Sequence, residues 1–422
     1  MPRDFIETNS IFERRESEGR SYCRAMPKVF STAKGSIMTD ENGQQWIDFL
    51  AGCSSLNYGH NDPDMKSALI DHITQDGVAH GLDFHTNAKA RFLESLEKLI
   101  LIPRNMDHRA MFTGPTGANA VEAAMKLARK ATGRQNIIAF TNGFHGVTTG
   151  ALSATANSYH RGGAGMALNG VTRMPYDGYM NGKCDTADFL TAMLEDESSG
   201  LDHPAAFILE TVQGEGGLNA ANSHWLKRIA KLAKKHDILL IVDDIQAGCG
   251  RCEGFFSFEK SGIVPDIITM AKSISGFGLP MAMVLVRPAY DLLGPAEHNG
   301  TFRGNTHAFV TANVALNKFW GTSKFEQQVF EKSTKLTDQL KDIATLIPGS
   351  YIKGRGMMQG IDVIDTILAS KICRNAFENG LMIETSGNRD QVVKVLAPLT
   401  TPQSLLDDGI SILKKATQSA LQ

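Results

Sequence analysis

The sequence predicts an α/β fold built on a mostly parallel sheet flanked by helices, with a smaller α+β domain beside it. Between about residues 61 and 315, short apolar runs typical of buried strands alternate with amphipathic stretches typical of helices. After about residue 316, a long charged helix is followed by strands and further helices. The length of 422 residues suits two or three domains, because a single core rarely grows past about 250–300 residues.

Three segments follow from this pattern: residues 1–60, a large domain at 61–315 and a small C-terminal domain at 316–422. The N-terminal segment carries a short strand pair around residues 34–47 and is expected to join the small domain, because strand edges need partners. Helices of the large domain are expected at residues 64–75, 88–102, 118–132 and 224–236. Its strands are expected at residues 110–114, 136–140, 205–211, 238–244, 267–273 and 281–286. In the small domain we expect a helix at residues 324–345 and strands at 357–363, 381–384 and 392–396.

Composition excludes several classes of function. The net charge of −2 gives no reason to expect a nucleic-acid or membrane-surface partner. No apolar run approaches the ~18 residues of a membrane span. The first eight residues lack the apolar core of a signal peptide, so we expect a cytoplasmic protein.

The six cysteines are expected to be free thiols in a chain of this length. Cys249 and Cys252 form a C-x-x-C pattern, but no second pair and no nearby histidine pair accompanies it, so no metal site is expected. We interpret the two as small residues in a glycine-rich turn.

Two apolar runs end in charged residues, one at Asp243 and the other at Lys272. Parallel strands present such residues at one edge of the sheet, where an open α/β fold binds its ligand. An amine and a carboxylate at that edge suit pyridoxal 5'-phosphate (PLP), because the amine forms a Schiff base with the cofactor and the acid pairs with its pyridine nitrogen. The alternative is that the two groups neutralise each other.

Other polar residues are expected near the same edge. The loop that contains Thr116, Gly117 and Ala118 lies between a strand and a helix, where backbone N–H groups and the helix dipole favour a phosphate. A tight turn with capping residues is the alternative. Phe144, after the next strand, could stack on a planar ring. Alone, that segment also suits a core phenylalanine with a capping histidine, His145.

Carboxylates and a polar loop complete the set of candidates. Glu210 ends a strand at the same edge and could brace the surroundings of Asp243, whereas Glu215, in the loop after it, also suits a solvated position. Near residue 300, Thr301 could donate to a phosphate, and Arg303 could bind a carboxylate through its planar guanidinium.

Together these segments resemble the class III (ornithine/ω-amino acid type) aminotransferases, which share fold type I of the PLP-dependent transferases. The resemblance covers nearly the whole chain, and its most specific block is Asp243-x-x-Gln246 followed by Lys272. The other matching segments are Gly52, Tyr58-Gly-His60, Thr116-Gly-Ala118, Phe144-His-Gly146, Glu210, Gln213-Gly-Glu-Gly-Gly217, Gly250-Arg251, Thr301, Gly304-Asn305 and Ala397-Pro-Leu399. A seven-stranded, mostly parallel sheet is implied.

The resemblance also implies roles for single residues. Lys272 holds PLP and moves the proton, Asp243 keeps the ring nitrogen protonated, and Gln246 contacts the ring's phenolic oxygen. Thr301 reaches the phosphate of a neighbouring subunit, which implies a homodimer or higher homo-oligomer with shared sites. The cofactor-binding residues expected in this way are Thr116, Gly117, Ala118, Phe144, His145, Glu210, Gln246, Gly300 and Thr301.

The segments most similar within the family imply L-glutamate as amino donor and L-aspartate 4-semialdehyde as acceptor, with ectoine formation as the pathway served. Glu215 is then the gate-like glutamate beside the substrate. Where relatives have an arginine that grips the substrate α-carboxylate, this chain has Lys394, which lacks the bidentate fork. Arg303 and Arg355 are therefore further candidates for that contact. Where many relatives have Ser or Thr beside the phosphate, this chain has Ala118, so one hydroxyl donor to the phosphate is missing.

Three alternatives remain at this level. One is another ω-aminotransferase, acting on ornithine, 4-aminobutyrate or a diamine. Another is an aminomutase that moves an amine within one molecule. The third is a non-catalytic protein of the same fold, against which the intact pair of Asp243 and Lys272 argues.

Overall fold

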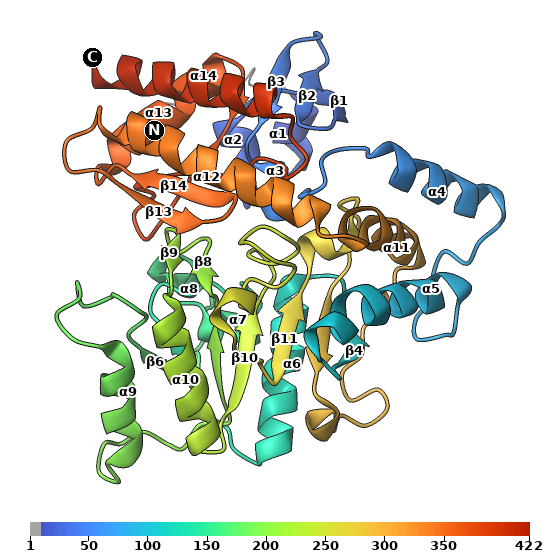
Figure 1. Cartoon of the computed structure of the whole chain (residues 1–422), viewed down its shortest axis with the longest axis vertical. Coiled ribbons are helices and arrows are strands. Elements are labelled where there is room, and N and C mark those ends of the chain that lie inside the picture. The colour runs from blue at the N-terminus through green and yellow to red at the C-terminus, as the bar shows by residue number, and fades with distance from the viewer. Residues whose placement is uncertain (1–9) are drawn as a thin grey trace.

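A seven-stranded sheet forms the centre of the molecule in the computed structural model, which describes residues 10–422 (Figure 1). The spatial order is β4 (Arg109–Phe112), β12 (Met283–Val286), β11 (Ile267–Met270), β10 (Leu239–Asp243), β7 (Ala206–Leu209), β5 (Ile137–Phe140) and β6 (Val171–Met174). Only β12 runs antiparallel to its neighbours. The predicted mostly parallel sheet is therefore confirmed. Residues 1–9 lie outside the described residues. They include the first eight residues, on which the expectation of no signal peptide was based, and the start of the predicted segment 1–60.

Both faces of this sheet are buried, which explains the continuous apolar character of its strands. Leu240 and Val242 of β10 point to the core shared with helix α10 (Ser223–Lys235), and Leu239 and Ile241 point to the core shared with helix α6 (Gly117–Thr132). The alternation of successive side chains between two faces follows from the pleat of the strand. Helices on both faces hold the strand ends at fixed positions.

The seventh strand, β6, was not predicted from the sequence. It pairs with β5 alone, at the edge of the sheet. Three of its four residues are only half-buried, and Thr172 and Arg173 are polar. An edge strand therefore lacks the apolar run that marks the central strands.

The small domain contains an antiparallel sheet and three long helices. The sheet order is β13 (Tyr351–Arg355), β14 (Met358–Asp362), β17 (Val392–Val395) and β16 (Glu384–Ser386). The helices are α12 (Lys324–Ala344), α13 (Thr366–Glu378) and α14 (Gln403–Leu421). The strand predicted at 381–384 is instead split between two sheets, because Leu381 and Met382 form the separate strand β15.

The N-terminal residues pair with this small domain. The strands β1 (Phe30–Lys34), β2 (Ile37–Asp40) and β3 (Gln45–Asp48) replace the predicted strand pair, and β3 pairs in parallel with β15. The N-terminal strands accordingly lie beside the C-terminal helices in Figure 1. Trp46 of β3 stacks on Phe377 of α13 and donates to its carbonyl oxygen over 2.8 Å. The boundaries at residues 60 and 315 stay a prediction.

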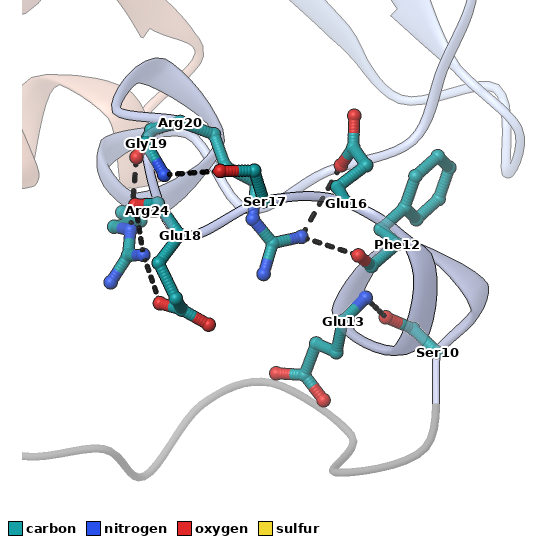
Figure 2. A network of polar contacts seen from close by, with 9 residues as sticks. All are labelled: Ser10, Phe12, Glu13, Glu16, Ser17, Glu18, Gly19, Arg20 and Arg24. Carbon is teal, nitrogen blue, oxygen red and sulfur yellow. Dashed lines mark hydrogen bonds and ion pairs between the residues drawn. The ribbon is translucent and has the colours of Figure 1, made fainter.

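Arginine side chains organise the two short N-terminal helices, α1 (Ile11–Arg15) and α2 (Tyr22–Ala25). Arg20, between them, donates to the carbonyl oxygen of Phe12 and pairs with Glu16, and Arg24 pairs with Glu18 (Figure 2). These pairs are exposed, so each contributes at most about 1 kcal/mol to stability. The remaining α-helices are α3 (Ala51–Ser54), α4 (Pro63–Thr74), α5 (Asn87–Ser95), α7 (Thr149–Ala154), α8 (Ser158–Gly162), α9 (Thr186–Glu195) and α11 (Thr306–Trp320).

The predicted helix at 88–102 begins as α5 and continues as a π-helical turn over Leu96–Leu101. All six cysteines are free, and Cys249 and Cys252 are both buried. Within residues 10–422, no helix has both the length and the apolar character to span a membrane, and no cluster of metal-ligating side chains occurs.

Candidate active site

A cavity of about 430 Å³ lies at the C-terminal edge of the parallel strands. Asp243 is the last residue of β10, Lys272 follows β11 by two residues, and Glu210 directly follows β7; all three line this cavity. The structure therefore brings the two charged strand ends together at one edge, as parallel pairing requires. Gly117, Ala118, Phe144, His145, Glu215 and Gln246 line the same cavity.

Asp243 is buried, with 4 % of its surface exposed, and both of its carboxylate oxygens have hydrogen-bond partners. Thr269 donates its hydroxyl to Oδ1 over 3.0 Å, and the backbone N–H of Ile245 donates to the same oxygen over 3.3 Å. The imidazole Nδ1 of His145 lies 2.7 Å from Oδ2. These contacts fix the direction of the carboxylate.

His145 couples Asp243 to Glu210. Burial alone lowers the pKa of His145, but the hydrogen bond and charge of Asp243, with the charge of Glu210, outweigh burial and raise it. Burial, helped by the charge of Asp243, raises the pKa of Glu210 to about 7. Glu210 also accepts hydrogen bonds from the N–H groups of Phe144, over 2.8 Å, and Gly214, over 3.2 Å. It therefore fixes the loop that presents Phe144 to the cavity.

Lys272 occupies the left-handed region of backbone conformation, with a φ of 54°. Such a conformation is uncommon for a residue with a Cβ and has to be held by its surroundings. The next residue, Ser273, supplies part of that support. Its Oγ donates to the carbonyl oxygen of Ser54 over 2.6 Å and accepts the N–H of Asn57 over 2.9 Å. The amine of Lys272 has no hydrogen bond or ion pair with any residue in the described part of the chain.

The segment held by Ser273 is itself a left-handed turn. Ala51, Gly52, Cys53 and Ser54 have φ values of 47°, 55°, 56° and 70°. A left-handed turn costs roughly 1–2 kcal/mol for each residue other than glycine. The carboxylate of Asp48 offsets part of this cost by accepting the N–H groups of Leu50 and Ala51 over 2.8 Å each.

Arg251 ties the same segment to the small domain. Its guanidinium is fully buried and donates to Asn57 Oδ1 over 2.6 Å, to the carbonyl oxygen of Ala397 over 2.6 Å and to that of Met357 over 3.0 Å. All three acceptors are neutral, and burial lowers the pKa of Arg251 to about 10. This side chain fastens together three segments that surround the active site.

The N-terminus of α6 forms the wall of the cavity that suits an anion. Thr116 caps this helix by accepting the N–H of Asn119, and the N–H groups of Gly117 and Ala118 open it without intrahelical acceptors. A Cβ at Gly117 would approach Ile245 Cδ1 to 2.9 Å, so a glycine lets the helix start close to the β10 loop. Backbone N–H groups at a helix N-terminus are a common phosphate site.

Four side chains form a charged chain on the small-domain side of the cavity. Gln246 donates to Glu215 over 3.0 Å, and Lys394 lies between Glu215, at 3.1 Å, and Glu384, at 2.8 Å. Lys394 is fully buried. Burial raises the pKa of Glu215, but the charges of Lys394 and Lys272 outweigh burial and lower this pKa to about 2. The cation predicted for the substrate carboxylate is thus already paired with two carboxylates of this chain.

Replacing Lys394 with methionine is expected to lower the free energy of unfolding at pH 7 by at most about 3 kcal/mol, because the largely buried Glu384 and the one-third exposed Glu215 both lose their cation. Burial then dominates and raises the pKa of Glu215, so the deficit should shrink as pH falls from 7 to 5. Urea unfolding at both pH values measures this. Lys332→Met is the control, because Lys332 donates only to the carbonyl oxygen of Leu399. A loss of unfolding free energy that is the same at pH 7 and pH 5 would contradict the pairing of Lys394 with the two carboxylates.

Besides Thr116 and Lys394, four predicted residues do not line the cavity. Gly300 lies against Gly114, and Thr301 is exposed. Arg303 pairs with Asp83 at 3.0 Å. Arg355 donates to the carbonyl oxygens of Ala221 and Ser257 over 3.3 and 2.8 Å. Their roles in binding stay predictions.

Sequence reasoning missed several residues that shape the site. Ser55, Ile245 and Met281 line the cavity, and Ser273 holds the turn beside it. Ile245 and Ser273 follow Asp243 and Lys272 closely in the chain, so position at a strand end was a usable signal for them. Ser55 and Met281 carried no such signal.

A mostly parallel sheet with an amine and a carboxylate at one edge, facing a helix N-terminus, defines a PLP-dependent enzyme of fold type I. The chain belongs to the class III aminotransferases, whose family model matches residues 21–417. The enzyme class, the cofactor and the fold predicted from the sequence are thereby confirmed.

The chain is similar to curated and solved relatives over nearly its full length. It is 52 % identical over 411 residues to the diaminobutyrate–2-oxoglutarate transaminase of Vibrio parahaemolyticus, covering 97 % of each chain. It is 51 % identical over 415 residues to that of Halomonas elongata, covering 97 % of this chain and 99 % of the relative. An ornithine aminotransferase structure from Toxoplasma gondii, with PLP at partial occupancy in its active site, matches with a TM-score of 0.85 at 26 % identity, covering 97 % of this chain and 93 % of the other.

The residues of the cavity fit PLP. Gln246 Oε1 is buried without a hydrogen-bond partner, and the Lys272 amine is unpaired within residues 10–422. Asp243 offers a fixed, charged carboxylate, and the N-terminus of α6 offers N–H groups for a phosphate. These features supply one partner each for an aldehyde, a pyridine nitrogen, a phenolic oxygen and a phosphate.

Proposed function

We propose that the chain transfers the amino group of L-glutamate to L-aspartate 4-semialdehyde, giving L-2,4-diaminobutyrate and 2-oxoglutarate. The observation that carries this proposal is the pair of Lys272 and Asp243 at one cavity, in a chain about half identical along its length to diaminobutyrate–2-oxoglutarate transaminases. Ectoine formation, suggested by the sequence resemblance, is the proposed use of the product.

When bound, PLP supplies an aldehyde that takes up the amino group and a ring that stores the electron pair released at the substrate carbon. We propose that Lys272 Nζ holds the cofactor and then carries a proton between the substrate carbon and the cofactor. Asp243, fixed by Thr269 and His145, keeps a proton on the ring nitrogen. Its charge acts in a dry site, where the interaction is far stronger than in water.

The other proposed contacts surround the ring. Phe144 covers one face of it, held in place by Glu210. Gln246 contacts the phenolic oxygen through the oxygen atom that has no partner in the described structure. Thr116, Gly117 and Ala118 bind the phosphate. Ala118 retains its N–H, so the absence of a hydroxyl at this position leaves the backbone contact intact.

Glu215 is proposed as the gate beside the substrate. Its carboxylate lines the cavity while paired with Lys394 and Gln246. In this arrangement the charge of Lys394 is neutralised when no substrate carboxylate is present. A glutamate carboxylate that enters the site would compete with Glu215 for Lys394, whereas a substrate without a carboxylate at that position would leave the pair closed.

A panel of amino donors tests the function. With 2-oxoglutarate as acceptor, L-2,4-diaminobutyrate is expected to give a kcat/KM at least about tenfold above those of ornithine and 4-aminobutyrate, which corresponds to ~1.4 kcal/mol of discrimination. The formation of glutamate measures each rate. A higher kcat/KM with ornithine than with diaminobutyrate would favour ornithine aminotransferase activity, which is the activity named for the 26 % identical structure. Turnover without 2-oxoglutarate would indicate an aminomutase.

We also propose a homo-oligomer with shared sites and a cytoplasmic location. The exposed position of Thr301, next to Gly300, supports the proposal of a homo-oligomer. Sedimentation of the holoenzyme tests it, and a fully active monomer contradicts it. Recovery of the enzyme in the membrane fraction of disrupted cells would contradict the cytoplasmic location.

A further inference from the structure

A second cavity, of about 320 Å³, adjoins the first and shares Phe144 and Glu215 with it. Its wall is built from the loop after β5, the start of α8 and the turn between β16 and β17. Besides Glu215 and His160, the polar residues of this wall are Asn142, Asn157, Ser158, Ser386, Asn388 and Asp390. The shared residues place the second cavity directly beyond the position proposed for the substrate.

Negative charge predominates in this cavity. Glu215 and Asp390 are its two carboxylates, and no lysine or arginine is among the described residues that line it. His160 is its one titratable nitrogen base in that set. Asp390 forms no ion pair or side-chain hydrogen bond within residues 10–422, whereas Glu215 is already paired with Lys394. Asp390 therefore remains available as a counter-charge.

A buried hydroxyl gives an independent indication that the cavity holds a ligand. Ser386, the last residue of β16, is 2 % exposed and lines the cavity, and its Oγ is buried without a hydrogen-bond partner. An unpaired buried hydroxyl costs free energy unless a ligand or water satisfies it. Asp390 is exposed, and burial of part of its carboxyl together with the nearby charge of Glu215 raises its pKa. A bound cation would satisfy Ser386 Oγ and offset the repulsion between Asp390 and Glu215.

The proposed substrate has a cation at the required place. Diaminobutyrate reacts through its C4 amine, and two carbon atoms further along it carries an α-ammonium group that takes no part in the transfer. This group has to lie beyond the reacting carbon, on the side away from Lys272. Neither 4-aminobutyrate nor glutamate has a second ammonium group, so neither can use a counter-charge there.

We propose that the second cavity is the subsite for the α-ammonium group of diaminobutyrate, with Asp390 as its counter-charge and Ser386 Oγ as a hydrogen-bond acceptor. This inference rests on the proposed function and names the residues that set its substrate preference. Asp390 is thus a specificity-determining residue that touches the substrate away from the reacting atoms.

The test is the Asp390→Asn variant as holoenzyme, assayed in half-reactions with L-2,4-diaminobutyrate, 4-aminobutyrate and L-glutamate. Loss of the PLP absorbance measures each rate. The variant is expected to lower kcat/KM for diaminobutyrate about 10- to 100-fold, as loss of a charge-assisted hydrogen bond does. The rates with 4-aminobutyrate and glutamate should not fall. Ser386→Ala should lower the diaminobutyrate rate by a smaller factor in the same selective way.

Asp237→Asn is the matched control. Asp237 and Asp390 are both exposed aspartates in the left-handed region, with φ values of 50° and 58°. Asparagine tolerates that conformation, and Asp237 lies at the end of α10, outside both cavities. Retained activity on glutamate verifies that each variant is folded.

Two results overturn the inference, and they are distinguishable. If wild type uses diaminobutyrate and Asp390→Asn loses activity equally on all three donors, or on none, the subsite is wrong while the proposed function stands. If wild type fails to use diaminobutyrate but reacts with another donor, the proposed function fails and the subsite fails with it.

Discussion

The Lys272→Ala variant is expected to lose transaminase turnover by roughly 10²–10⁴-fold from the missing proton transfer alone. Lys272 is the only lysine among the described residues that line the active-site cavity, so no second amine can take its place. The variant should still bind PLP through the phosphate and ring contacts, but without a covalent bond. Single-turnover assays with L-glutamate measure the rate of the chemical step.

Added methylamine separates a chemical role of Lys272 from a structural one. A small amine can replace the missing side chain only when the surrounding site is intact, so it should restore part of the rate. Lys353→Ala is the control, because Lys353 is a half-buried lysine of the small domain that lies 3.8 Å from Asp362. Near wild-type turnover in Lys272→Ala would contradict the proposed role.

The Asp243→Asn variant is expected to lower kcat by roughly 10²–10³-fold, in line with the removal of single preorganised groups in other enzymes. Asparagine keeps the shape of the side chain but removes the charge that favours a protonated ring nitrogen. The turnover number with saturating L-glutamate and acceptor measures this loss. Asp243→Glu, which retains the charge at a shifted position, should recover part of it.

The same variant should change His145. The charge and hydrogen bond of Asp243 raise the pKa of His145 against the opposing effect of burial. With that charge removed, burial dominates, and the pKa of His145 should fall below its ordinary value. An NMR titration of the imidazole follows this change. An unaltered pKa together with unaltered kcat would mean that Asp243 does not act on the site electrostatically.

The centre of the fold and the edge that carries the site were predictable from local sequence pattern. Apolar runs that end at Asp243 and Lys272 identify central strands, and parallel pairing brings their C-terminal ends together. Edge strand β6 escaped prediction because Thr172 and Arg173 interrupt its apolar pattern. Pattern reasoning therefore works where a strand is buried on both faces.

The surroundings of Lys394 were not predictable, because they depend on strand register. Glu384 of β16 lies directly opposite Lys394 of β17, a pairing that no sequence spacing reveals. The sequence suggested a cation that binds the substrate, and the structure shows this cation paired with Glu384 and Glu215. The left-handed turn at residues 51–54 is similar, since only Gly52 among its members signals such a conformation.

Every proposed step of the reaction depends on a covalent bond between Lys272 and PLP. Borohydride reduction of the holoenzyme makes that bond permanent, and proteolysis followed by mass spectrometry locates the modified peptide. A single pyridoxyl modification is expected, on the peptide that contains Lys272, and none is expected in Lys272→Ala. A modification on any other lysine, or an unmodified protein that still binds PLP and is active, would contradict it.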